Sequence, residues 1–105
     1  MRSATRKKIG KNPAYLAFIR TLPCEVCGAY PVEAAHVGAG PRGFSAKCPD
    51  NETIPLCARH HRTGKDAHHV LGRNFWSHHG IDRCKTIQQL NEAFEVFRDL
   101  KPFLA

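Results

Sequence analysis

The spacing of the hydrophobic residues predicts two helices, one near each end of the chain. The hydrophobic positions of the first helix are Tyr15, Phe18, Ile19 and Leu22. Those of the second helix, expected at about residues 83–100, are Ile87, Leu90, Phe94 and Phe97. Both sets recur every three or four residues, as on one face of an α-helix. Asn12 followed by Pro13 suits the start of the first helix, and Asp82 suits the start of the second.

Between these helices the pattern predicts two short strands, a loop and a third helix. Residues 30–37 (YPVEAAHV) and residues 52–57 (ETIPLC) contain strand-forming residues, and Pro55 indicates an edge strand. Residues 38–51 between them are rich in glycine and proline, as loops are. A helix is expected to begin near Cys57. The order of strand, loop, strand and helix predicts an α+β domain.

The length of 105 residues fits a single domain, and the hydrophobic content of 42% fits a globular one. Small domains bury a modest core, so they often depend on a metal or on disulfides. Five cysteines are an odd number, which argues against a closed disulfide framework. The chain has no apolar run long enough to span a bilayer, and its basic N-terminus lacks the apolar segment of a secretory signal. We therefore expect a cytoplasmic protein with reduced thiols and no membrane partner.

The charge of the chain is one-sided. Sixteen lysines and arginines face nine acidic residues, which gives a formal net charge of +7 with neutral histidines. This excess favours a polyanionic partner, although a basic surface that serves solubility alone is the alternative. Residues 1–12 are expected to form a basic flexible arm, either a solvated tail or a segment that contacts phosphates. Residues 13–105 are expected to form the single domain.

Two pairs of potential metal ligands are separated by a loop. Cys24 and Cys27 form a C-x-x-C pair, and Cys57 and His60 form a C-x-x-H pair further along the chain. The first pair alone also fits a redox dithiol, but that hypothesis leaves the second pair unexplained. Two such half-sites are what a tetrahedral structural Zn²⁺ requires. The spacing therefore predicts a zinc knuckle that uses all four side chains.

Four stretches of the sequence carry a resemblance to a known family. They are PCEVCG (residues 23–28), EAAHVG (33–38), RGFSAKCPDNETIPLCARHHRTGKDAHHVLG (42–72) and FWSHHGID (75–82). With these motifs the chain resembles the HNH endonucleases of the ββα-metal (His-Me finger) superfamily, in particular small phage and prophage nucleases related to the Ref family. The resemblance covers residues 24–80. It implies a small ββα-metal core with a structural zinc knuckle and flanking helices.

The resemblance also implies a general base. In the family the first histidine of the motif activates the attacking water, and the matching residue is His36, at the end of the first predicted strand. Imidazole suits this task because it can accept a proton near neutral pH. The residue that orients the base must come from the PDNE segment, where Asp50 and Asn51 both match in part. The two remain alternatives, and a plain turn is a third possibility for this segment.

A second site is implied for a catalytic divalent ion such as Mg²⁺ or Mn²⁺. Its first ligand in the resemblance is His61, and neighbouring helical residues point about 100° apart, so His60 can face the zinc while His61 faces the cleft. His69 is the expected second ligand, with His68 as its rival. Many family members place a metal-binding residue directly before the base, and Ala35 stands there instead. Water and phosphate oxygens could complete the coordination.

The implied function is metal-dependent hydrolysis of phosphodiester bonds in DNA, with little sequence specificity. The basic residues expected to contact phosphates are Arg42, Lys47, Arg62, Lys65 and Arg73. Because of Ala35, a non-catalytic zinc-knuckle DNA-binding protein, an accessory to phage recombination, is the main alternative. A zinc-stabilised protein-interaction module is a third hypothesis, but it leaves the remaining histidines and the charge unexplained. His78 and His79 precede Gly80 at an expected helix end, where imidazoles suit the helix dipole, and we expect no metal there.

Overall fold

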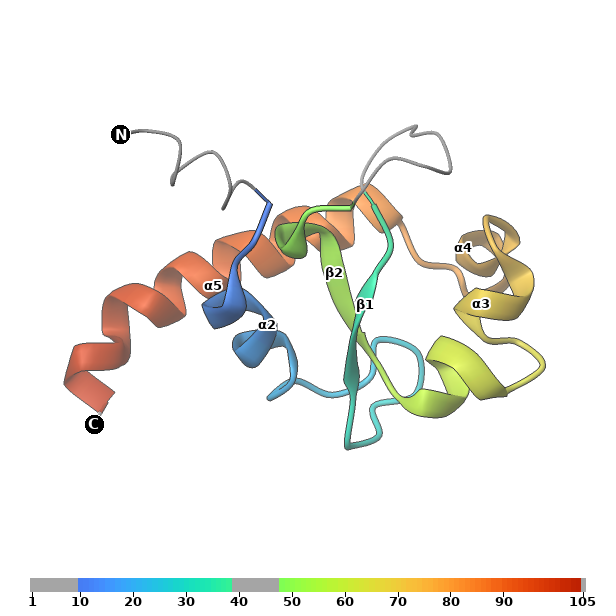
Figure 1. Ribbon diagram of the computed structural model, residues 1–105, viewed down its shortest axis with the longest axis horizontal. Coiled ribbons are helices and arrows are strands. Elements are labelled where there is room, and N and C mark those ends of the chain that lie inside the picture. Colours follow the sequence, from blue (N-terminus) through green and yellow to red (C-terminus); the bar gives the residue numbers. More distant parts are fainter. Residues whose placement is uncertain (1–9, 39–47, 105) are drawn as a thin grey trace.

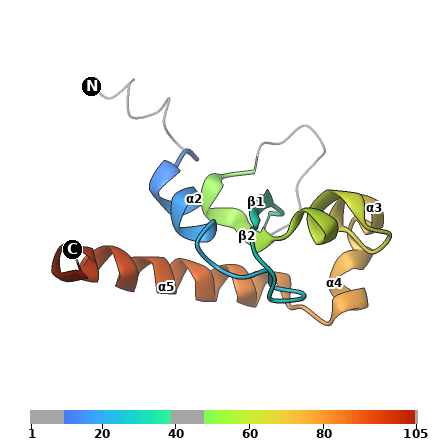
Figure 2. The ribbon, with the colours of Figure 1, turned by 90° about the horizontal axis from the view of Figure 1, so that it is seen from below.

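The computed structural model describes residues 10–38 and 48–104, an α+β arrangement around a two-stranded sheet. Its elements in chain order are α2 (Pro13–Ile19), β1 (Glu33–His36), the 3-10 turn η1 (Asp50–Glu52), β2 (Thr53–Leu56), the π-helical turn η2 (Arg59–Thr63), α3 (His68–Leu71), α4 (Asn74–His79) and α5 (Arg83–Leu104). The strands lie at the centre, with α2 on one side of them and α3 and α4 on the other (Figure 1). Seen from below, α5 runs along one face of the molecule, and α3 and α4 gather where it begins (Figure 2).

The two strands pair in antiparallel register over four residues each. Glu33 lies opposite Leu56 at one end of the ladder, and His36 lies opposite Thr53 at the other. All of β2 is buried, because α2 and α5 both pack against it. Side chains alternate between the two faces of a strand, so Ala35 points into the core while His36 is exposed. The register therefore places an exposed histidine at the end of the ladder, next to a residue buried in the core.

The helix starts expected from the sequence are confirmed. The Asn12 side chain accepts a hydrogen bond from the backbone N–H of Tyr15 at 3.1 Å, and Pro13 occupies the first helical position. Asp82 in the same way accepts a bond from the N–H of Lys85 at 3.0 Å at the start of α5. Such side-chain caps satisfy N–H groups that have no partner within the helix.

The core joins the two hydrophobic helix faces through aromatic rings. Tyr15 and Phe94 meet edge to face with their ring centroids 5.2 Å apart, and Phe18 lies 5.5 Å from Phe94. Ile87 and Leu90 extend the buried face of α5, as the sequence predicted. The other fully buried large side chains include Ile19, Ile54, Leu56 and Phe75. Burial of these apolar and aromatic surfaces is the main favourable term that holds the short sheet between the helices.

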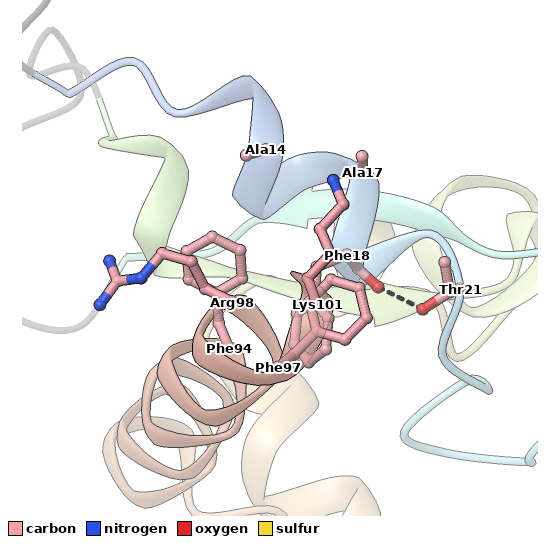
Figure 3. A pocket seen from close by; sticks show the side chains of 8 residues that line it. All are labelled: Ala14, Ala17, Phe18, Thr21, Phe94, Phe97, Arg98 and Lys101. Atoms are coloured by element: carbon pink, nitrogen blue, oxygen red, sulfur yellow. Dashed lines mark hydrogen bonds between the residues drawn. The ribbon is translucent and has the colours of Figure 1, made fainter. Parts of the chain in front are cut away.

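Beyond Phe94 the helix α5 continues past the end predicted near residue 100 and reaches Leu104. Its outer part and α2 enclose an apolar hollow of about 240 Å³, in which Phe18, Phe94 and Phe97 form the wall (Figure 3). Thr21 at the end of α2 donates its hydroxyl to the carbonyl of Phe18 at 2.7 Å. Among the described residues, no helix has the length and apolar character needed to cross a membrane.

The helix expected near Cys57 takes a different form. The chain makes the π-helical turn η2, in which the N–H of Gly64 donates to the carbonyl of Arg59 at 2.8 Å, five residues back. The turn ends at Gly64. A π-turn is wider than an α-turn, and such turns occur often at functional sites. Here it directs the adjacent residues His60 and His61 toward different neighbours.

Candidate functional site

Cys24, Cys27, Cys57 and His60 come together at one point, as the sequence predicted, and could bind a metal such as zinc. The Nδ1 atom of His60 lies 3.3 Å from the Cys57 sulfur and 3.8 Å from the Cys24 sulfur, and the sulfurs of Cys27 and Cys57 are 3.8 Å apart. Tetrahedral zinc with ordinary bond lengths sets about 3.8 Å between two thiolates and about 3.6 Å between a thiolate and an imidazole nitrogen. The donor set therefore fits a four-coordinate metal.

The first two cysteines are held by a tight turn. The N–H of Gly28 donates to the carbonyl of Cys24 at 2.8 Å, and Gly28 has a φ of 76°, a conformation that glycine adopts without strain. The next residue, Glu25, donates its N–H to the carbonyl of Pro55 at 2.9 Å. This bond ties the turn to β2, directly before Cys57. This backbone bond thus joins the two half-sites.

The electrostatics favour the metal-binding protonation states at His60 and Cys24, whereas burial and the neighbouring cysteines raise the pKa of Cys57. His60 is 3% exposed, and burial lowers its pKa, so its imidazole is neutral at physiological pH and can coordinate. Burial acts to raise the pKa of Cys24, but backbone N–H groups, including that of Val26 at 3.4 Å, stabilise its thiolate and bring the pKa below the ordinary value. A neutral histidine beside a stabilised thiolate is ready to bind a divalent ion.

His36, at the end of β1, and Asp50, in η1, form a second group of interacting side chains. The Nε2 atom of His36 lies 2.9 Å from Oδ1 of Asp50. The His36 side chain is 43% exposed, whereas that of Asp50 is 10% exposed. Because a carboxylate only accepts, Nε2 carries the proton of this contact, and in the neutral imidazole Nδ1 keeps its lone pair. The pair therefore presents an accessible basic nitrogen in a fixed ring orientation.

Asp50 is itself held by the segment that precedes α2. The N–H of Asn12 donates to its Oδ2 at 2.7 Å, and its own N–H donates to the carbonyl of Gly10 at 2.7 Å. The pKa of Asp50 is lowered, first by the hydrogen bond from His36 and then by that from Asn12. The neighbouring Asn51 is exposed and contributes its backbone carbonyl to the side chain of Asn91. Of the two candidates for orienting the base, Asp50 is the one that contacts His36.

His61 belongs to a third group, centred on a residue that the sequence did not single out. Its Nδ1 atom lies 2.6 Å from Oε1 of Glu33 on β1. Arg62 donates to both oxygens of the same carboxylate, at 2.8 and 2.6 Å. These bonds, led by those from Arg62, lower the pKa of Glu33 to about 2. The only sequence signal for Glu33 is an acidic residue inside a predicted strand, three positions before His36.

The two histidines that compete as partners of His61 have different surroundings. The ring of His69 meets that of His61 edge to face, with centroids 4.6 Å apart. His68 instead packs against Phe75 and Trp76, at 5.3 and 5.6 Å. Burial, followed by nearby positive charge, lowers the pKa of His68 to about 4. The structure therefore brings His69 to His61 and uses His68 in packing.

The basic residues predicted to contact phosphates differ in their surroundings. Arg42 and Lys47 lie outside the described residues. Arg62 is engaged by Glu33 in the two-bond ion pair described above. Lys65 and Arg73 are exposed. The described part of the chain thus exposes three of the five side chains, and one of these, Arg62, is paired with Glu33.

Comparison with known proteins places nearly the whole chain in one family model. A model described as "Protein of unknown function (DUF968)" matches residues 1–96. Searches of curated proteins and of solved structures gave no match. The chemistry of the side-chain groups described above is therefore the basis for a functional conclusion.

Proposed function

This chain belongs to the DUF968 family, and from its side-chain chemistry we propose that it is a metal-dependent endonuclease of the HNH type that hydrolyses phosphodiester bonds in DNA. The observation that carries this proposal is the contact between His36 and Asp50. An exposed imidazole whose second nitrogen is held by a buried carboxylate is the arrangement that a general base needs. The basic charge of the chain suits the polyanionic substrate.

His36 would act through its free Nδ1 atom. That nitrogen removes a proton from a water molecule as the water attacks the phosphorus atom, and the imidazolium that forms is stabilised by the Asp50 carboxylate. The bond from phosphorus to the leaving oxygen breaks, and the leaving oxygen takes a proton from solvent water. The bond at Nε2 keeps the ring in one tautomer, so Nδ1 is the accepting atom throughout. Asp50 is thus a positioning residue, and the Asn12 N–H keeps its carboxylate ionised and fixed.

His61 and His69 would hold the catalytic divalent ion, which supplies positive charge to the scissile phosphate and the leaving oxygen. Glu33 accepts a hydrogen bond from the Nδ1–H of His61, which leaves the lone pair of His61 Nε2 to coordinate an ion. A carboxylate bound to the second nitrogen of a metal-binding histidine orients the ring and raises its basicity.

The cysteine cluster would hold a structural Zn²⁺. All four ligands come from protein side chains, which is typical of structural rather than catalytic zinc sites. The site joins the turn at Cys24 to the connection between β2 and η2 and so fixes the position of His61 next to its ligand His60. In a domain with a two-stranded sheet, this metal would contribute directly to folding.

The position of Ala35 favours one alternative function. Its side chain is fully buried in the core, so this chain has no acidic ligand directly before His36. A protein that binds DNA through its basic surface without cutting it, an accessory to recombination, would retain the zinc cluster and the positive charge. The two functions differ in whether an added divalent ion produces strand breaks.

A nicking assay with supercoiled plasmid separates them. The full-length protein should convert supercoiled to open-circular DNA when Mg²⁺ or Mn²⁺ is added and should not do so in chelator. DNA binding should be measured in the same buffers by fluorescence anisotropy. Binding without nicking across a panel of divalent ions would establish the accessory role in place of the nuclease.

A further inference from the structure

A third group of potential ligands lies outside both sites described above. Asp66, in the connection between η2 and α3, meets His78 and His79 in the last turn of α4, and one ligand atom of each lies within 4.8 Å of the others. Asp66 and His79 are half-buried, and His78 is exposed. The three residues come from segments on either side of α3, so the fold rather than local sequence brings them together.

The surroundings hold this group in place before any ligand binds. The Nε2 atom of His79 donates to the backbone carbonyl of Asp66 at 2.9 Å, which leaves Nδ1 as its ligand atom, and the ring of His79 packs 4.6 Å from that of Phe75. The rings of His78 and His79 stand nearly perpendicular, with centroids 4.7 Å apart. The ring of His79 is thus fixed by packing and by a backbone hydrogen bond, while His78 remains accessible to an incoming ion.

The Asp66 carboxylate lies between two imidazoles. Oδ2 of Asp66 lies 3.8 Å from Nε2 of His79 and 3.7 Å from Nε2 of His60. Both distances exceed that of a good hydrogen bond, so neither histidine satisfies this oxygen. A cation at the centre of the group would give the carboxylate a close partner. His60 turns its other nitrogen, Nδ1, toward the cysteine sulfurs, so it is already engaged.

We propose that Asp66, His78 and His79 form a second metal site, selective for a divalent transition ion such as Zn²⁺, Co²⁺ or Ni²⁺. Two imidazoles and one carboxylate are a ligand set that suits these ions, whereas Mg²⁺ and Ca²⁺ prefer oxygen ligands. Three protein ligands leave at least one position for water or for a group of a partner molecule. With a single negative ligand the site binds its ion more weakly than the cluster of three cysteines and His60.

Filling this site would have a structural consequence. It would join the end of α4 to the connection between η2, which contains His61, and α3, which contains His69. The ion would also share the Asp66 carboxylate with His60. Binding at the second site should therefore stabilise the half of the molecule that presents the proposed catalytic ion.

The test is a titration of the full-length protein whose cysteine cluster is already filled with zinc. Co²⁺ is added and followed by calorimetry and by absorption. The wild type should bind an ion without the near-ultraviolet band of a thiolate–cobalt bond, and excess Mg²⁺ should not displace it. His78→Gln, a change at an exposed position, should bind one ion fewer. His69→Gln is the matched control, because it removes a histidine from the proposed catalytic site and should leave this ion bound.

Equal numbers of bound ions with equal affinity in the wild type and in His78→Gln would overturn the proposal and leave Asp66 as a hydrogen-bonding residue only. Should the variant fail to fold by circular dichroism, the imidazole ¹⁵N signals of the wild type decide the question. Those of His78 and His79 should shift as zinc is added beyond one equivalent. Unchanged signals would likewise overturn the proposal. Loss of nuclease activity is not used in this test, so its result is independent of the function proposed above.

Discussion

The Nε2 atom of His36 lies 2.9 Å from Oδ1 of Asp50, and this contact joins the exposed end of β1 to a nearly buried carboxylate. Asp50 also accepts a hydrogen bond from the N–H of Asn12, the N-cap residue of α2. The contact fixes both the orientation and the tautomer of the imidazole. This contact is the observation on which we base the proposal that His36 is the general base.

Replacing Asp50 should damage catalysis more than binding. Asp50→Asn keeps the size of the side chain but allows its amide to donate to His36, which would move the ring proton to the wrong nitrogen. We expect the nicking rate to fall at least about tenfold, which is less than the full rate factor contributed by a general base. Affinity for DNA should stay within a factor of two or so, because Asp50 carries no positive charge.

Asn51→Ala is the matched control for this change. The Asn51 side chain is exposed, and its described hydrogen bond uses the backbone carbonyl, which alanine retains. Its nicking rate should remain close to that of the wild type. If Asn51→Ala were impaired while Asp50→Asn were not, the assignment of the positioning residue would have to be exchanged.

His60 and His61 should give opposite phenotypes although they are adjacent. His60 belongs to the cysteine cluster, so His60→Ala should lower the zinc content of the purified protein and the midpoint of thermal unfolding. His61 faces Glu33 instead, so His61→Ala should keep zinc and fold but lose nicking. Elemental analysis, thermal melts and the plasmid assay measure the three quantities. Loss of zinc from both variants to the same extent would show that the π-turn does not separate the two roles.

Tyr15 should make the protein sensitive to alkaline pH. Its side chain is fully buried, its hydroxyl has no hydrogen-bond partner among the described residues, and burial raises its pKa from 10.0 to about 12. The folded state disfavours the phenolate, so this contribution to the free energy of unfolding is complete below about pH 10 and is lost as the pH rises from 10 to 12.

Tyr15→Phe removes both the buried hydroxyl and this titration. At pH 8 the variant should be at least as stable as the wild type, because it leaves no unsatisfied polar group. Between pH 10 and pH 12 it should lose about 2–3 kcal/mol less of its free energy of unfolding. Urea unfolding at each pH measures the difference. A parallel decline of the two proteins would mean that the phenol gains access to solvent in the folded state.

Lys65 and Arg62 should differ in their contribution to DNA binding. Lys65 is exposed, whereas Arg62 is engaged by the Glu33 carboxylate in a two-bond ion pair. Lys65→Ala should reduce the slope of log affinity against log salt by up to about 0.9, the value for one phosphate contact. Arg62→Ala should change the slope less. Anisotropy measured over a range of salt concentrations would contradict this expectation if the two variants gave equal slopes.

Local sequence patterns predicted much of the fold, because they depend on neighbouring residues. Asn12 and Asp82 act as helix caps, and the apolar faces of α2 and α5 are buried as their spacing indicated, except that Leu22 lies beyond the end of α2 and Phe97 is exposed. The ligand spacing likewise predicted the cluster of three cysteines and His60. These features follow from helical periodicity and from the short distances within each half-site.

Other parts of the site depend on contacts between distant segments. Glu33 meets His61 across 28 residues, and Asn12 meets Asp50 across 38. No periodic pattern marks such pairs, since any acidic residue on a strand looks the same in a sequence. The π-helical form of η2 was missed for a related reason, because it is set by the requirement that His60 reach the sulfurs while the chain turns at Gly64.

Chemical rescue tests directly whether His36 supplies the base for phosphodiester hydrolysis. His36→Ala should fold, retain zinc and bind DNA like the wild type, while its nicking rate falls roughly 10²–10⁴-fold. Added imidazole should restore a measurable part of that rate, with little effect on the wild type, because the small molecule can occupy the space left at an exposed position. If His36→Ala nicked DNA at the wild-type rate in the same divalent ion without imidazole, His36 would not be the general base.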